Sequence, residues 1–233
     1  MTGWKPIPHF ALVNRLEAYS TMTQTEMTQT ETEIVEHVQC LVCERMAGQQ
    51  AGHDVDHVLR VLKSAREIQK EVGGNRFVVE LAALLHDLGD AKFHDGNERS
   101  AEFARDILSH LHVDRDTIEH VATIVDTISF RKAVDPTTLS LEAKIVQDAD
   151  RLDALGAIGI VRTIEYGAAI GQPFYLSDNL DGKRKTGIDH FDEKLFKLHD
   201  LLNTDAARRI AGQREQFMRT FLDQFRHECG ETR

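Results

Sequence analysis

The chain has 233 residues, of which 41% are apolar and 28% charged, and its formal net charge at pH 7 is −10. This composition is typical of one globular domain with an apolar core, and the negative charge disfavours a protein that binds DNA or RNA non-specifically. No stretch is apolar for long enough to cross a membrane, and the first residues lack the pattern of a secretory signal. We therefore expect a cytoplasmic protein with neither a nucleic-acid nor a membrane partner.

The first part of the chain is polar and low in complexity. Residues 20–33, "STMTQTEMTQTETE", are rich in Thr, Gln and Glu and bury little. We predict a mobile N-terminal extension over residues 1–31, with regular structure starting near Thr32, and one domain over residues 32–233. Met22 and Met27 are candidate starting points, and a start at either would make the residues before it an upstream extension.

The first expected helix contains a C-x-x-C motif at Cys40 and Cys43. Three cysteines in the whole chain fit a reducing compartment, and no second C-x-x-C accompanies the first. We therefore favour two small buried side chains over a structural metal or redox site.

Helical periodicity dominates the rest of the chain. Apolar residues from Val55 to Val72 recur at three- and four-residue spacing, and a helix over 76–88 is apolar almost all round, which places it in the centre of a bundle. Further helices are expected at 97–111, 114–129, 138–154, 155–167, 190–201 and 204–227, and the glycine-containing polar segment 171–187 is expected to be a loop. The predicted fold is all-α, a single helical bundle.

A histidine and an aspartate, His86 and Asp87, end the apolar helix predicted at 76–88. A buried ionised aspartate is costly unless it is paired or binds a metal, and the adjacent histidine adds a nitrogen ligand. The alternative is an ordinary helix end in water, where a histidine is favoured by the helix dipole. These two residues alone leave both interpretations open.

Two other helices bring polar residues to apolar surroundings. His57 lies at the flank of the apolar face of its helix, with His53 and Arg60 one turn away on the same side. Farther along, the segment "AKIVQDADRLDALGAIG" (143–159) holds three aspartates within an apolar helix, and Asp150 and Asp153 share a face. A solvated charged face explains this pattern poorly.

The stretches "DHVLRV", "LLHDLGD" and "QDADRL" together resemble the H…HD…D pattern of the HD-domain metal-dependent phosphohydrolases. The longer segments "AKIVQDADRLDALGAIGIVRT", "HFDEKL" and "FMRTFLDQF" resemble the bacterial branch typified by the YedJ and YpgQ proteins. The resemblance covers residues 32–228 and implies a helical bundle of the HD-domain type. It also implies four metal ligands, which are His57, His86, Asp87 and Asp150.

Two imidazoles and two carboxylates suit octahedral Mn²⁺, Mg²⁺ or Co²⁺, with Fe²⁺ as a further candidate, better than structural Zn²⁺. Such an ion would polarise a phosphate and lower the pKa of a bound water. Asp90 is our candidate for the catalytic base, since related enzymes often have a glutamate there, although Asp is shorter and a helix-terminal role is the alternative. Asp95 is a second acidic candidate.

An anionic substrate needs positive partners in an acidic protein. We expect Arg60, Lys92 and His53, together with Lys183 and Arg184 of the "GKRKTG" segment, to contact phosphate, while each also has a plain interpretation as a surface or structural residue. The resemblance to the YedJ and YpgQ branch implies that the protein is a nucleoside triphosphate pyrophosphohydrolase. The alternatives are a nucleotide 5′-monophosphatase and a non-catalytic regulatory module that binds metal or nucleotide. The sequence leaves the base, the sugar and the choice of monomer or homodimer open.

Overall fold

The computed structural model describes residues 27–47, 55–89, 98–128, 134–177 and 183–230. These residues form helices joined by turns and loops and contain no strand, which confirms the all-α fold. The α-helices are α1 (Gln29–Arg45), α2 (Val55–Val72), α3 (Arg76–Leu85), α4 (Ser100–His110), α5 (Arg115–Thr127), α6 (Leu141–Asp153), α7 (Gly156–Ala169), α8 (Gly187–His190) and α9 (Asp205–Glu228).

Helix α3 forms the centre of the bundle, as its apolar sequence predicts. Every residue from Phe77 to Leu85 is buried, and the helix packs against α1, α2, α5 and α6. Asn75 caps its first turn by accepting a hydrogen bond from the backbone of Val78 at 3.2 Å. The result is a helix that is fixed on all sides, so that the residues at its end have well-defined positions.

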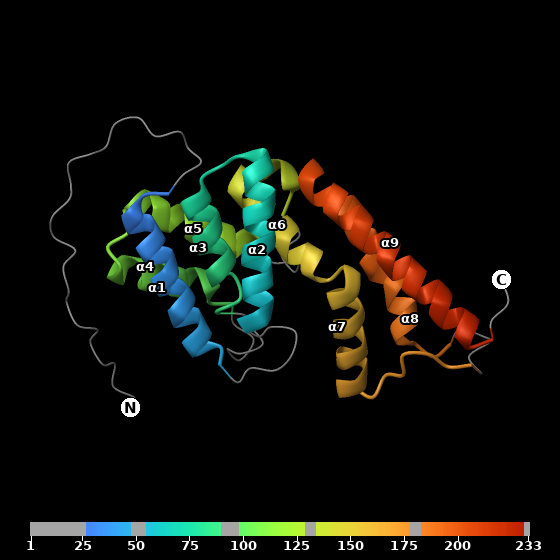
Figure 1. The fold of residues 1–233 in the computed structure, drawn as a ribbon. Coiled ribbons are helices and arrows are strands. Elements are labelled where there is room, and N and C mark those ends of the chain that lie inside the picture. The colour runs from blue at the N-terminus through green and yellow to red at the C-terminus, as the bar shows by residue number, and fades with distance from the viewer. Residues whose placement is uncertain (1–26, 48–54, 90–97, 129–133, 178–182, 231–233) are drawn as a thin grey trace, which may run out of the picture.

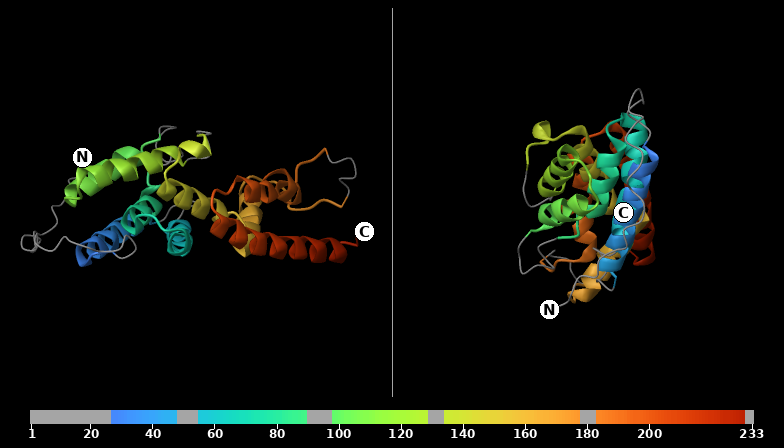
Figure 2. Two further views of the ribbon diagram at one scale, coloured as in Figure 1. Left: turned by 90° about the horizontal axis from the view of Figure 1, so that it is seen from above. Right: turned by 90° about the vertical axis from the view of Figure 1, so that its left-hand side faces the viewer.

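The molecule is elongated, with α1–α5 at one end and α7–α9 at the other (Figures 1 and 2). Helix α6 lies between them and packs against α2, α3 and α5 as well as against α7 and α9. At the second end, the ring of Phe174 contacts Phe191, Phe221 and Phe225 edge to face, which joins the segment before α8 to α9. Helix α6 therefore connects the two ends of the fold.

A buried carboxylate fixes the side of α6 that faces α9. Asp148 is fully buried, and its two oxygens accept hydrogen bonds from the backbone N–H groups of Asn203 and Thr204, both at 2.8 Å. Thr204 is the N-cap of α9. Burial raises the pKa of Asp148 even though these hydrogen bonds act in the opposite direction. Asp148 thus joins α6 to the start of α9.

Several expected boundaries differ from the structure. The first helix begins at Gln29 rather than near Thr32, because Thr28 and Glu31 form a capping box in which each side chain accepts from the backbone N–H of the other. The polar segment thus contains the start signal of the helix. The helix expected at 138–154 is divided into a 3₁₀ turn, η3 (Pro136–Thr138), and α6, which Ser140 caps.

The helix expected at 190–201 is also irregular. After the short α8 the chain forms a π-helical turn, η4 (Phe191–Leu195), and then 3₁₀ turns, η5 (Phe196–Leu201). This winding keeps Phe191, Leu195 and Leu198 in the core. The expectation of two buried cysteines was wrong, since Cys40 is exposed and Cys43 half-buried on α1.

Candidate metal centre

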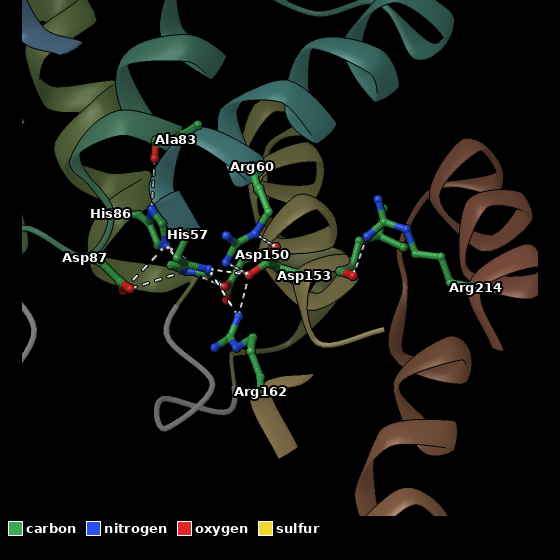
Figure 3. Close-up of polar contacts among 10 residues, drawn as sticks. His57, Arg60, Ala83, His86, Asp87, Asp150, Asp153, Arg162 and Arg214 are labelled. Carbon is green, nitrogen blue, oxygen red and sulfur yellow. Dashed lines mark hydrogen bonds and ion pairs between the residues drawn. The ribbon is translucent and has the colours of Figure 1, made fainter. Parts of the chain in front are cut away.

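Four side chains from α2, from the turn after α3 and from α6 converge at one point (Figure 3). His57 is the third residue of α2, His86 and Asp87 follow directly after α3, and Asp150 lies in the last turn of α6. The two Nε2 atoms of His57 and His86 are 3.3 Å apart. His57 Nε2 lies 3.4 Å from Asp87 Oδ2 and 3.4 Å from Asp150 Oδ1.

The distances from the second histidine complete the cluster. His86 Nε2 lies 3.5 Å from Asp87 Oδ1 and 4.0 Å from Asp150 Oδ1. His57, His86 and Asp87 each offer a ligand atom within 4.8 Å of those of the other two. The two histidines are buried, whereas the side chain of Asp150 is 39% exposed. The structure thus brings together the four residues that the resemblance implied, with one side accessible from solvent.

The turn that carries His86 and Asp87 is held by Gly89. A Cβ atom at this position would lie 2.3 Å from the backbone nitrogen of Ser100, so only glycine fits against the start of α4. The carbonyl of Gly89 also accepts a hydrogen bond from the N–H of Arg99 at 2.9 Å. Gly89 is therefore needed for close backbone packing beside the centre.

The contacts of Nδ1 define which ring nitrogen carries the proton in each of the two histidines. His86 Nδ1 lies 2.9 Å from the carbonyl oxygen of Ala83, which can only accept, so this nitrogen donates. His57 Nδ1 lies 2.7 Å from Asp153 Oδ2, and two acceptors do not approach so closely, so this nitrogen donates as well. In the neutral rings both Nε2 atoms then present lone pairs to the cluster.

Lone pairs of two imidazoles and oxygens of two carboxylates therefore face one another. Such an arrangement is favourable only when a proton or a cation lies among the atoms. Metal-binding histidines commonly donate their outer N–H to a carboxylate or to a backbone carbonyl, and these two histidines show one case each. The donor set fits a divalent cation.

The ionisation of the cluster agrees with this chemistry. Burial lowers the pKa of His57, but hydrogen bonds with Asp150, Asp153 and Asp87 outweigh burial, so the pKa is raised well above its ordinary value. Burial raises the pKa of Asp150, but its hydrogen bond with His57 and the charges of both histidines lower it overall. The centre attracts positive charge, which a bound metal ion would supply in place of protons.

Asp153 and Arg162 contact this centre, and the sequence did not mark either as a site residue. Asp153 accepts from His57, from Arg60 Nε at 2.7 Å and Nη2 at 3.0 Å, and from Arg162 Nη1 at 2.5 Å. Burial would raise the pKa of Asp153, but His57 and the two arginines hold it far below its ordinary value. The position of Asp153 three residues after Asp150 was the available signal. Arg162 lies at the end of the segment that resembles the YedJ and YpgQ branch, but no local pattern indicated its contact, because it reaches the centre only through the packing of α7.

The other predicted site residues have three different outcomes. Asp90, Asp95, Lys92 and His53 lie outside the described residues. Lys183 and Arg184 are exposed in the segment that precedes α8. Arg60, which we expected to contact phosphate, lies beside the centre with its side chain 33% exposed and holds Asp153.

No helix in the described ranges has the length and apolar character that a membrane span requires. Residues 54–155 match the model of the HD domain family. The protein YpgQ of Bacillus subtilis is 38% identical over 193 residues, which cover 81% of this chain and 90% of that protein. The chain is thus similar to YpgQ over most of both lengths.

Solved structures show the same likeness. The crystal structure of B. subtilis YpgQ in complex with ADP has a TM-score of 0.72 at 32% identity, and the match covers 86% of this chain and 97% of that one. An HD-superfamily hydrolase from Bacillus thuringiensis has a TM-score of 0.73 at 39% identity, with 87% and 100% covered.

Proposed function

Because this chain belongs to the HD-domain family and is therefore a metal-dependent phosphohydrolase, we propose that its substrate is a nucleoside triphosphate, from which it releases pyrophosphate. The observation that carries the proposal is the convergence of two imidazole nitrogens and two carboxylates at the solvent-accessible centre. The complex of YpgQ with ADP supports a nucleotide as the ligand, since YpgQ matches this chain over most of its length.

In this proposal His57, His86, Asp87 and Asp150 hold one divalent ion. Their nitrogen and oxygen donors suit Mn²⁺, Mg²⁺, Co²⁺ or Fe²⁺, and four protein ligands of an octahedral ion leave two positions for water and phosphate. When bound, the ion would withdraw charge from phosphorus and lower the pKa of a water. Asp90, with Asp95 as the second candidate, stays our prediction for the group that takes the proton of that water.

Two arginines bring guanidinium groups beside the centre of this acidic chain. Arg60 and Arg162 are 33% and 25% exposed, and both contact the carboxylate of Asp153. Guanidinium groups in such a position favour the phosphates of a nucleotide. Lys92, His53, Lys183 and Arg184 stay predicted phosphate contacts.

A turnover assay tests this proposal. Metal-free protein is incubated with nucleoside tri- and monophosphates, with and without Mn²⁺ or Mg²⁺, and pyrophosphate and phosphate are measured separately. We expect pyrophosphate from triphosphates only when a metal is present. Phosphate from monophosphates would instead identify a nucleotidase, and binding without any product would identify a regulatory module.

A further inference from the structure

Asp153 lies behind the candidate metal centre, at the end of α6. Its side chain is 4% exposed, and both of its oxygens are engaged. Oδ1 accepts from Arg60 Nε, while Oδ2 accepts from His57 Nδ1, Arg60 Nη2 and Arg162 Nη1 (Figure 3). The carboxylate therefore links α2, α6 and α7 at one point.

The contact with His57 has a directional consequence. When Nδ1 donates to Asp153, the proton is fixed on that nitrogen, and the lone pair of Nε2 points away from Asp153. Nε2 is the atom that lies within 3.4 Å of His86, Asp87 and Asp150. The position of Asp153 thus decides both the tautomer and the ring orientation of a predicted ligand.

Two arginines, and not a metal ion, balance the charge of Asp153. Arg60 binds it with two nitrogens, and Arg162 approaches it from α7. A buried carboxylate with two guanidinium partners stays ionised, and it does not need to move toward a metal ion to be satisfied. This separates Asp153 from Asp150, which points into the cluster and contacts the Nε2 atoms of the two histidines.

We propose that Asp153 is a positioning residue of the metal centre, which sets the affinity for the divalent ion by holding His57, and that the two arginines keep Asp153 in place. The inference rests on the proposed metal site, and it assigns to Asp153 no contact with the ion or with substrate. The second histidine is held in the corresponding way by the backbone carbonyl of Ala83. A side-chain substitution can therefore release His57 but not His86.

Helix α6 offers a matched control in Asp148. This aspartate is also buried and also accepts several hydrogen bonds, but its partners are Asn203 and Thr204 at the start of α9. Asp148→Asn and Asp153→Asn thus remove the same charge from the same helix, five positions apart. Only the second substitution disturbs the hydrogen bond of His57.

The experiment titrates metal-free protein with Mn²⁺ alone, in the absence of nucleotide, for wild type, Asp153→Asn and Asp148→Asn. Free Mn²⁺ is followed by electron paramagnetic resonance, and folding is checked by circular dichroism. We expect Asp153→Asn to weaken Mn²⁺ binding about 10- to 100-fold. Asp148→Asn should lower Tm and keep the wild-type affinity. Equal affinities of wild type and a folded Asp153→Asn, or equal weakening by both variants, would overturn the proposal.

Asp153→Glu is the second variant. It keeps the charge that pairs with the arginines, but the extra methylene displaces the carboxylate from His57, so we expect a folded protein with weakened Mn²⁺ binding. If both Asp153 variants fail to fold while Asp148→Asn folds, Asp153 is a residue of the fold and the proposal is wrong. A wild-type protein that binds no Mn²⁺ would instead contradict the proposed function itself, so the two failures are distinguishable.

Discussion

Two buried ionic clusters connect α2 with α3, and they differ in how their charges are balanced. In one, the fully buried Glu80 accepts from Arg66 Nη2 at 2.5 Å and from Arg76 Nε at 2.6 Å, one oxygen for each arginine. In the other, His57 and His86 present lone pairs to each other and to two carboxylates. In the first cluster both carboxylate oxygens already have donors within the protein, whereas the second cluster gains most from an added cation.

The comparison shows that burial of charge alone does not identify a functional site. Glu80 is more deeply buried than Asp87 or Asp150. Its pKa is nevertheless lowered, since the two arginines outweigh the effect of burial, which raises it. A site is better identified by acceptors that face one another than by the depth at which they lie.

The largest expected effect concerns the cluster of His57, His86, Asp87 and Asp150. Asp150→Ala removes one of its four acceptors and should lower the phosphohydrolase activity at least about 1,000-fold, because a metal contributes several kcal/mol to such a reaction. The measurement is kcat/KM with the nucleotide that wild type hydrolyses. Glu80→Gln is the control and should keep its activity once folded. Activity of Asp150→Ala near that of wild type would show that Asp150 is not a ligand.

Metal binding should stabilise the protein through the same cluster. At 100 times its Kd, Mn²⁺ adds about 2.7 kcal/mol to the free energy of unfolding, which for a chain of this size raises Tm by roughly 5–10 °C. Thermal unfolding with Mn²⁺ and with a chelator measures the shift. Glu80→Gln should show the same rise in Tm with Mn²⁺, starting from its own lower Tm. Asp150→Ala should show little rise in Tm. An equal shift in Asp150→Ala would place the ion elsewhere.

The cluster of Glu80, Arg66 and Arg76 should affect stability without affecting metal binding. Glu80→Gln leaves two guanidinium groups without their carboxylate and should lower the free energy of unfolding by about 2 kcal/mol, less than for a fully buried pair because the arginines are about one-third exposed. Denaturant unfolding measures this change. The control is Glu71→Gln, which breaks an exposed pair with Arg209 between α2 and α9 and should lower the free energy of unfolding much less, because solvent screens this pair. Equal costs would mean that burial of Glu80 is unimportant.

The smallest effect is a dependence of stability on pH. The pKa of Glu80 is lowered in the folded protein from its ordinary value of 4.5, so the folded state binds this proton less readily than the unfolded chain. The stabilisation is fully present above that value and is lost as the pH falls from there through the lower folded-state pKa. Unfolding free energies of wild type and Glu80→Gln, measured from pH 6 downward, should approach each other. A difference between the two unfolding free energies that stays constant with pH would show that the pKa of Glu80 is not lowered in the folded protein.

The bundle could be predicted because its signals are local. Helix α3 is apolar on nearly every side, and Gly73, Gly74 and Asn75 separate it from α2. The exact start of α1 was missed because Thr28 and Glu31 form their capping box inside a segment that looks low in complexity. The irregular winding of η4 and η5 could not be predicted either, since it follows from the packing of Phe191 and Leu195.

For the candidate metal centre, the four ligands could be predicted, but the contacts around them could not. His86 and Asp87 stand out because two polar residues end a fully apolar helix, and the resemblance supplied His57 and Asp150. Arg60 was expected to contact phosphate, and it lies beside the centre, where its Nε and Nη2 donate to Asp153. These contacts join residues that are far apart in the chain, so no local pattern encodes them. The contact of Arg162 could not be predicted from its local sequence, because only the direction of α7 brings it near His57.

Arg162 lies outside the segment that matches the HD domain family, since the matched residues end at 155. A protein cut after residue 155 would keep both histidines and all three aspartates, yet it would lose one of the two guanidinium groups that hold Asp153. On the proposed role of Asp153, a shortened form that is meant to bind the metal ion needs α7 as well as the matched segment.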